Sequence, residues 1–173
     1  SSGNVVTMTS TIEGPFGSQL VANGYFLNNE LTDFDFTPER NGAPVANAVA
    51  PGKRPLSSMS PTLVYDADGR LILALGSAGG RRIIMHVTKT LIGVLDWGLP
   101  VDEAIALPNI YFGGDGLRIE QDSYLAEMQG EISALSGLVV ASSLTSKVNA
   151  VQWTEDGWVG AADPRSPGVA LSE

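Results

Sequence analysis

Residues 71–80 read LILALGSAGG, an apolar run that ends in a glycine-rich turn. This run is preceded by the turn residues DADG at 66–69 and, before them, by a second apolar run at 62–65. Two apolar runs on either side of an Asp-Gly turn predict a β-hairpin. Between residues 81 and 95 the apolar residues recur at helical spacing, and Gly98 follows the end of the pattern. The stretch therefore predicts a hairpin, a tight glycine turn and a helix in succession.

The sequence around this stretch predicts further strands and helices. Helices are expected at 101–106 and 123–135, and strands at 5–12, 25–29, 110–112, 117–120, 138–141, 148–153 and 158–161. The last two strands are expected to form a second hairpin around the turn residues EDG at 155–157. The segment 32–62 contains five prolines, which exclude a helix or a central strand there. We expect an ordered, packed loop because this segment also carries Phe34 and Phe36. The order of elements favours an α+β or layered αββα protein, and the length suits one domain spanning 1–173.

Composition excludes several classes of function. The 173 residues carry a net charge of −9, which argues against nucleic acid or an anionic membrane surface as a partner. There is no cysteine, so a disulfide framework, a thiolate metal site and a cysteine nucleophile are excluded. There is a single histidine, His86, so a multi-histidine metal site is excluded. Because His86 lies within a predicted helix, we expect it to be packed or exposed and not catalytic. No apolar run approaches the roughly 20 residues of a membrane span. We expect neither a metal nor a cofactor.

The glycine turn is the first candidate site. Consecutive glycines let the backbone approach a ligand, and the helix that follows adds the positive end of its dipole. Residues 76–80 are therefore suited to a phosphate, a carboxylate or an oxyanion. The turn lacks the Lys-Ser or Lys-Thr of a P-loop, and Gly-x-Ser-x-Gly is absent. The simpler interpretation is a tight strand-to-helix connection.

Two polar segments are the other candidates. Ser57 and Ser58 lie between Pro55 and Pro61 and offer two hydroxyl donors to an anion. Glu30 and Asp33 follow a predicted strand, and their carboxylates can converge on one cation such as an ammonium group. Taken alone, each segment is more simply interpreted as a solvated loop.

Together these segments resemble the small subunit of the γ-glutamyltransferase (γ-glutamyltranspeptidase) family. The resemblance rests on LNNE at 27–30 with Asp33, on PGKRPLSSMSPT at 51–62, on GSAGGRRI at 76–83, and on DPR at 163–165. It implies an N-terminal-nucleophile hydrolase fold, an αββα sandwich of two stacked, mainly antiparallel sheets flanked by helices. It also implies a precursor that cleaves itself into large and small subunits and is periplasmic or secreted. The reaction implied is transfer of a γ-glutamyl group from glutathione or a related compound to an amino acid, a peptide or water.

The resemblance also implies roles for particular residues. Gly79 and Gly80 would supply the N–H groups of an oxyanion hole. Ser57 and Ser58 would bind the α-carboxylate of the substrate, and Glu30 and Asp33 its α-ammonium. Thr11 matches a second threonine that orients the nucleophile.

Three features depart from the family pattern. Ala78 stands where familiar members have proline, and Glu13 stands where they often have a substrate-contacting asparagine. Glu13 adds a third carboxylate that would strengthen ammonium binding or change substrate preference. The nucleophilic threonine is expected shortly before Ser1, and the arginine that pairs with the α-carboxylate is expected in the large subunit. We therefore expect this chain alone to be inactive.

Two alternatives stay open at this stage. An acylase of the same family that cleaves glutaryl amides of cephalosporin-type compounds would act on a substrate without the α-ammonium, so the Glu30/Asp33 pair argues against it. A non-catalytic fragment that keeps the γ-glutamyl site would fit the missing nucleophile.

Overall fold

The computed structural model describes residues 3–171, which form an α+β fold of two compact units. Within the described residues, the first unit comprises 3–9 and 58–171, and the second comprises 10–57. That residues 1–173 act as one domain stays a prediction. No helix among the described residues is long and apolar enough to cross a membrane.

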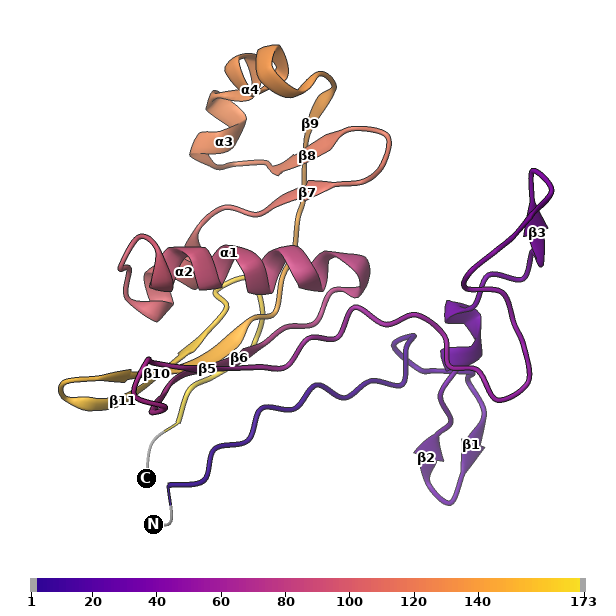
Figure 1. The fold of residues 1–173 in the computed structure, drawn as a ribbon, viewed down its shortest axis with the longest axis horizontal. Helices are drawn as coiled ribbons and strands as arrows, with labels where there is room; N and C mark the ends of the chain where they lie inside the picture. Colours follow the sequence, from indigo (N-terminus) through magenta and orange to yellow (C-terminus); the bar gives the residue numbers. More distant parts are fainter. Residues whose placement is uncertain (1–2, 172–173) are drawn as a thin grey trace. The chain divides into compact units, whose positions relative to one another are not determined.

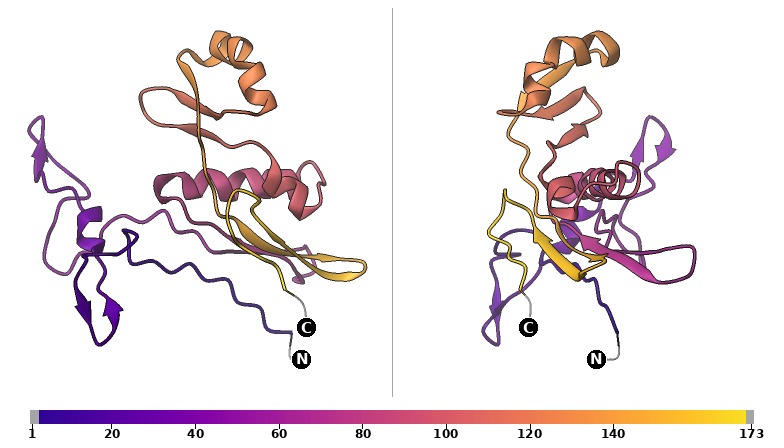
Figure 2. Two further views of the ribbon diagram at one scale, coloured as in Figure 1. Left: turned by 180° about the vertical axis from the view of Figure 1, so that it is seen from behind. Right: turned by 90° about the vertical axis from the view of Figure 1, so that its left-hand side faces the viewer.

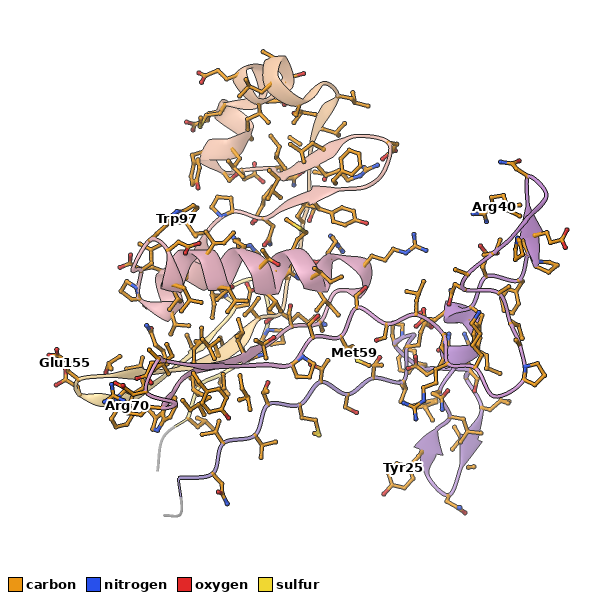
Figure 3. The ribbon with its side chains drawn as sticks, in the orientation of Figure 1. Tyr25, Arg40, Met59, Arg70, Trp97 and Glu155 are labelled. Atoms are coloured by element: carbon orange, nitrogen blue, oxygen red, sulfur yellow. The ribbon has the colours of Figure 1, made fainter. Side chains whose placement is uncertain are left out.

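A four-stranded antiparallel sheet forms the base of the first unit. Its strands are β5 (Thr62–Tyr65), β6 (Leu71–Gly76), β10 (Asn149–Thr154) and β11 (Gly157–Ala162), in the order β11-β10-β6-β5. Both predicted hairpins are present, and Arg70 and Glu155 mark their turns at the same end of the sheet (Figure 3). In the first turn the Asp66 carboxylate accepts bonds from the backbone N–H groups of Asp68 and Arg70 at 3.0 and 2.8 Å.

Helices cover one face of this sheet (Figure 1). The 3₁₀ turn η2 (Gly80–Arg82) leads into α1 (Ile83–Leu95), which is followed by α2 (Val101–Ala106). Their apolar side chains form the core with inward-facing strand residues: Leu73, Leu75, Ala150 and Ala161 from the sheet, and Ile83, Val87, Val101 and Ile105 from the helices. Gly93 allows the two helices to pack closely, because a Cβ there would lie 2.8 Å from the Cβ of Ala104.

The opposite face of the sheet is only partly covered by the described residues. Leu63 on β5 and Val151 on β10 point to this face and are 38% and 36% exposed. The predicted strand at 5–12 is wrong, because residues 3–12 form no ladder. Instead the Thr7 hydroxyl donates to the Leu75 carbonyl at 3.0 Å. A β-branched run becomes a strand only where a neighbouring strand offers backbone partners.

A second, three-stranded sheet lies on the other side of α1 and α2 from the first sheet (Figures 1 and 2). It contains β7 (Ile110–Phe112), β8 (Leu117–Glu120) and β9 (Val139–Ser142), with β7 antiparallel and β9 parallel to β8. The predicted helix at 123–135 is two helices, α3 (Tyr124–Glu127) and α4 (Gln129–Ser136), because Met128 leaves the helical conformation at φ −87° and ψ 7°.

A buried polar network joins the end of α2 to the C-terminal segment. Arg165 pairs with Glu120 at 2.7 Å and with Asp163, which is 1% exposed, at 3.2 Å. Arg165 also donates to the carbonyls of Ala106, the last residue of α2, and of Leu107, which follows it, and so satisfies helix-terminal acceptors. Lys89 also donates to the Leu107 carbonyl, and burial, followed by the charge of Arg165, lowers the pKa of Lys89 to about 8.

The second unit is built from short elements. They are β1 (Val21–Ala22), β2 (Tyr25–Phe26), the 3₁₀ helix η1 (Glu30–Asp33), β3 (Glu39–Arg40) and β4 (Ala43–Pro44), where β1 pairs with β2 and β3 with β4. The rings of Phe16 and Phe26 meet edge to face with centroids 5.4 Å apart. Phe34 is buried, as the sequence predicts, whereas Phe36 is 71% exposed, so only the first of these two aromatic residues packs inside the segment.

Candidate active site

The glycine turn between β6 and α1 has a backbone that other residues adopt only with strain. Gly79 has φ +140° and Gly80 has φ +59°. A Cβ on Gly79 would lie 2.9 Å from Cε1 of His86, whereas one on Gly80 would meet nothing within 4 Å. The N–H groups at the start of a helical segment have no acceptor within it, so this turn can present two donors to an anion.

His86 packs beneath this turn. It is 2% exposed, and its Nδ1 lies 3.2 Å from the buried hydroxyl of Ser77. Burial, followed by the charges of Lys89 and Arg82, lowers the pKa of His86 to about 4, so the ring is neutral near pH 7. A neutral, packed ring supports the turn, which agrees with the interpretation of His86 as a non-catalytic histidine.

The candidate ammonium site is centred on η1. Glu30 and Asp33 are the first and last residues of this 3₁₀ helix, and both are half-buried. Partial burial, followed by the negative charges of Asp33 and Glu13, raises the pKa of the Glu30 carboxyl above its usual range. Glu30 Oε1 is buried and receives no hydrogen bond from the described residues. Asp33 and Glu13 therefore both act on the Glu30 carboxyl within one unit.

Asn29 positions Glu13 in this group. Its side-chain Nδ2 donates to Glu13 Oε2 and, at 3.0 Å, to the Thr32 hydroxyl, while its Oδ1 accepts from the Gly14 N–H at 2.9 Å. Sequence reasoning missed this role. Adjacent asparagines before a helix are a signal for side-chain-to-backbone bonding, and Asn28 indeed accepts from the Glu30 N–H at 3.1 Å.

Thr11 and the two serines lie on extended or irregular backbone. The Thr11 hydroxyl accepts from the Glu13 N–H at 2.8 Å, which leaves its own proton for another acceptor. Ser57 is exposed, and Ser58 is half-buried with its carbonyl accepting from the Ser60 hydroxyl at 2.7 Å.

The candidate residues are divided between the two units. Thr11, Glu13, Glu30, Asp33 and Ser57 belong to the second unit, and Ser58, Gly79 and Gly80 to the first. That all of them contact one substrate stays a prediction. Among residues 3–171 no group of three or more His, Asp or Glu side chains is placed to hold a metal ion.

Comparison with known proteins identifies the family. A family model described as Gamma-glutamyltranspeptidase matches residues 1–172. The chain belongs to the γ-glutamyltranspeptidase family.

Individual members of the γ-glutamyltranspeptidase family match most of this chain. A glutathione hydrolase proenzyme from Escherichia coli is 37% identical over 95% of the chain, and an acylase ACY 1 proenzyme from Pseudomonas sp. strain SE83 is 32% identical over 98%. The chain spans 30% of the length of each of these relatives. The crystal structure of a Helicobacter pylori γ-glutamyltranspeptidase mutant superposes with a TM-score of 0.83 at 35% identity, over 95% of both chains. These neighbours are N-terminal-nucleophile hydrolases, so the predicted fold class is confirmed.

Proposed function

We propose that this chain is the small-subunit part of a γ-glutamyltransferase that transfers the γ-glutamyl group of glutathione and related compounds to amino acids, peptides or water. The observation that carries the proposal is the buried, unpartnered Oε1 of Glu30 beside the charges of Asp33 and Glu13. A buried carboxylate oxygen without a donor is costly, and crowding by two further carboxylates adds to that cost. An α-ammonium group supplies both the missing donors and the missing positive charge.

The other end of the amino-acid group would be bound by hydroxyls. Ser57 and Ser58 can each donate to the α-carboxylate. The substrate is then recognised as a zwitterion, because one segment supplies carboxylates and the other supplies hydroxyl donors. An arginine of the large subunit would complete the carboxylate site.

The chemistry proposed is acyl transfer through a threonine outside the described residues. Its hydroxyl oxygen attacks the γ-amide carbonyl carbon, and its own α-amino group accepts the hydroxyl proton. The oxygen of the tetrahedral intermediate accepts bonds from the N–H groups of Gly79 and Gly80, and such a donor is typically worth about 10²–10³ in rate. Collapse of the intermediate expels the leaving amine with that proton and forms a γ-glutamyl ester on the threonine. Water or an acceptor amine then attacks the ester and restores the free threonine.

Thr11 acts in this proposal as an orienting group. Its hydroxyl accepts from the Glu13 backbone N–H, so its orientation is fixed on one side while its proton is available to the nucleophile. This bond also places Thr11 next to Glu13, whose side chain accepts a hydrogen bond from Asn29.

The partner proposed is the large subunit of the same precursor. Leu63 and Val151 lie on one face of the first sheet, and each is more than a third exposed to solvent. Apolar sheet faces usually pack against a second layer. A second sheet from the large subunit would complete the αββα sandwich there. The related proteins also suggest a periplasmic or secreted location. Without the large subunit and the nucleophile, the 173-residue chain is expected to be inactive.

The competing function is that of an acylase that cleaves glutaryl amides, because an acylase proenzyme is 32% identical over almost the whole chain. Glutaryl amides carry no α-ammonium, so they would leave Glu30 Oε1 without a partner. This favours the γ-glutamyl substrate.

The test is release of p-nitroaniline from γ-glutamyl-p-nitroanilide, measured with the processed full-length protein and with the 173-residue chain. The full-length protein is expected to release the anilide and to accumulate a γ-glutamyl adduct on its threonine, detectable by intact mass. The short chain is expected to release none. Release by the short chain, or no release by the full-length protein, would contradict the proposal.

A further inference from the structure

Asn47 connects the two segments that are proposed to bind opposite ends of the substrate's amino-acid group. Its side-chain Nδ2 donates to the Asp33 carbonyl at 2.7 Å, and its Oδ1 accepts from the Leu56 N–H at 2.9 Å. Asp33 ends η1, and Leu56 directly precedes Ser57. One amide side chain therefore spans from the carboxylate segment to the hydroxyl segment. All of these residues lie in the same unit.

The backbone of Asn47 is fixed independently of its side chain. The Asp35 N–H donates to the Asn47 carbonyl at 3.0 Å, and Asp35 and Ala48 form a parallel bridge. Lys53 donates to the carbonyls of Ala46 and Ala48 on either side, the second at 3.0 Å. The amide is thus presented from a fastened loop, which lowers the entropy cost of holding both of its bonds.

The two hydrogen-bond partners determine which end of the Asn47 amide is Nδ2 and which is Oδ1. A carbonyl can only accept, so Nδ2 must face Asp33, and a backbone N–H can only donate, so Oδ1 must face Leu56. An aspartate or a leucine of similar size cannot make both bonds. The residue type therefore matches a connection between one carbonyl and one N–H.

The connected segments are otherwise joined by a long, proline-rich and glycine-containing loop. Residues 34–55 separate Asp33 from Leu56, and the β3–β4 hairpin within them is held by surface contacts such as the exposed Arg40–Asp35 pair. A loop of this length does not by itself fix the separation of its ends. Bonds made by Asp35 and Lys53 fasten the middle of this loop, and the Asn47 side chain adds the direct link between Asp33 and Leu56.

We propose that Asn47 is a positioning residue that sets the separation between the ammonium-binding segment ending at Asp33 and the carboxylate-binding segment beginning at Ser57, and so selects substrates that carry both charged groups. This inference rests on the proposed function. With Asn47 in place, recognition of the zwitterion depends on the distance between the two binding segments as well as on their charge.

The consequence separates two kinds of substrate. A γ-glutamyl amide must reach both segments at once, so its binding depends on their separation. A glutaryl amide uses only the carboxylate-binding segment that begins at Ser57, so its binding does not depend on the separation of the two segments. Loss of the Asn47 amide should therefore weaken the γ-glutamyl substrate more than the glutaryl substrate. General damage to the fold would reduce both alike.

The experiment compares Asn47→Ala with Arg40→Gln in the processed full-length protein. Arg40 lies in the same loop and is exposed, and its pair with Asp35 does not involve the Asp33 carbonyl or the Leu56 N–H. Steady-state kinetics are measured with γ-glutamyl-p-nitroanilide and with glutaryl-p-nitroanilide. The melting temperature is recorded for each variant.

Asn47→Ala is expected to raise KM for the γ-glutamyl substrate about tenfold, because misplaced segments would cost the substrate about one hydrogen bond, with kcat within about twofold. Its KM for the glutaryl substrate and the kinetics of Arg40→Gln should match the unmodified protein. An unchanged γ-glutamyl KM in Asn47→Ala, or an equal rise for both substrates, would overturn the inference. Absence of γ-glutamyl turnover in the unmodified protein would instead overturn the proposed function, so the two failures are distinguishable.

Discussion

Replacing Gly79 with alanine should destabilise the protein far more than the same change at Gly80. Alanine at φ +140° occupies a region that is close to glycine-only, which costs about 1–3 kcal/mol. Its Cβ would also lie 2.9 Å from His86 Cε1, and forcing a packed ring aside costs about 1–3 kcal/mol more. At Gly80 the new Cβ meets nothing, and the left-handed conformation at φ +59° costs only about 1–2 kcal/mol.

The difference between the two variants is therefore expected to be about 2 kcal/mol, from the strained backbone and the contact together. Urea denaturation of the processed full-length protein measures it as the difference in free energy of unfolding. Adding His86→Ala to each variant separates the two causes, because removing the ring should relieve Gly79→Ala in part and leave Gly80→Ala unrelieved. Equal destabilisation by the two alanines would show that the turn is not supported by the histidine ring.

Three further predictions concern stability and catalysis. Because the folded-state pKa of His86 falls from 6.5 to about 4, the unfolded chain binds more protons between these values, so stability should rise with pH across this window. The gain in the free energy of unfolding corresponds to about 3 kcal/mol. His86→Gln should remove this gain, which urea denaturation between pH 4 and 7 measures; the charged groups next to the ring are Lys89, Arg82 and Asp163. If the stability of His86→Gln rises with pH as steeply as that of the unmodified protein, the prediction is contradicted. Arg165→Gln should cost about 3 kcal/mol because it leaves Glu120 and Asp163 unpaired, whereas Arg118→Gln, which breaks an exposed pair with Asp115, should cost under about 1 kcal/mol. Thermal unfolding distinguishes them, and similar losses would show that the buried network contributes little. Thr11→Val should lower kcat for γ-glutamyl-p-nitroanilide with KM nearly unchanged, since its hydroxyl is proposed to orient the nucleophile; a rise in KM alone would assign Thr11 to substrate binding instead.

Local signals in the sequence account for most of the fold. The Asp-Gly turn at 66–69, the helical spacing after Arg81 and the Glu-Asp-Gly turn at 155–157 each depend on neighbours in sequence, and the structure has the hairpins and the helix that they predict. The strand at 5–12 failed because a ladder needs a partner that local pattern does not supply. The helix at 123–135 was interrupted at Met128, where apolar spacing continues although the backbone does not.

The candidate site divides in the same way. The charged and hydroxyl-bearing residues could be selected from the sequence because their chemistry is carried by residue type. The residues that hold these side chains in place could not be selected from the sequence. Asn29 contacts Gly14 across fifteen positions, Asn47 contacts Asp33 across fourteen, and Ser77 contacts His86 from a different element. Such bonds follow from how the loops fold back, and a polar residue in a loop gives no indication of which backbone group it will meet.

The most direct test of the account is the preference of the processed full-length protein for γ-glutamyl over glutaryl p-nitroanilide, measured as the ratio of kcat/KM. Glu30, with its buried and unpartnered oxygen, and Asp33 are proposed to bind the α-ammonium group that only the first substrate carries. Hydrogen bonds to charged groups are worth about 1.5–3 kcal/mol each, so two of them predict a ratio of about 100 or more. A ratio near one, or faster turnover of the glutaryl amide, would contradict the assignment.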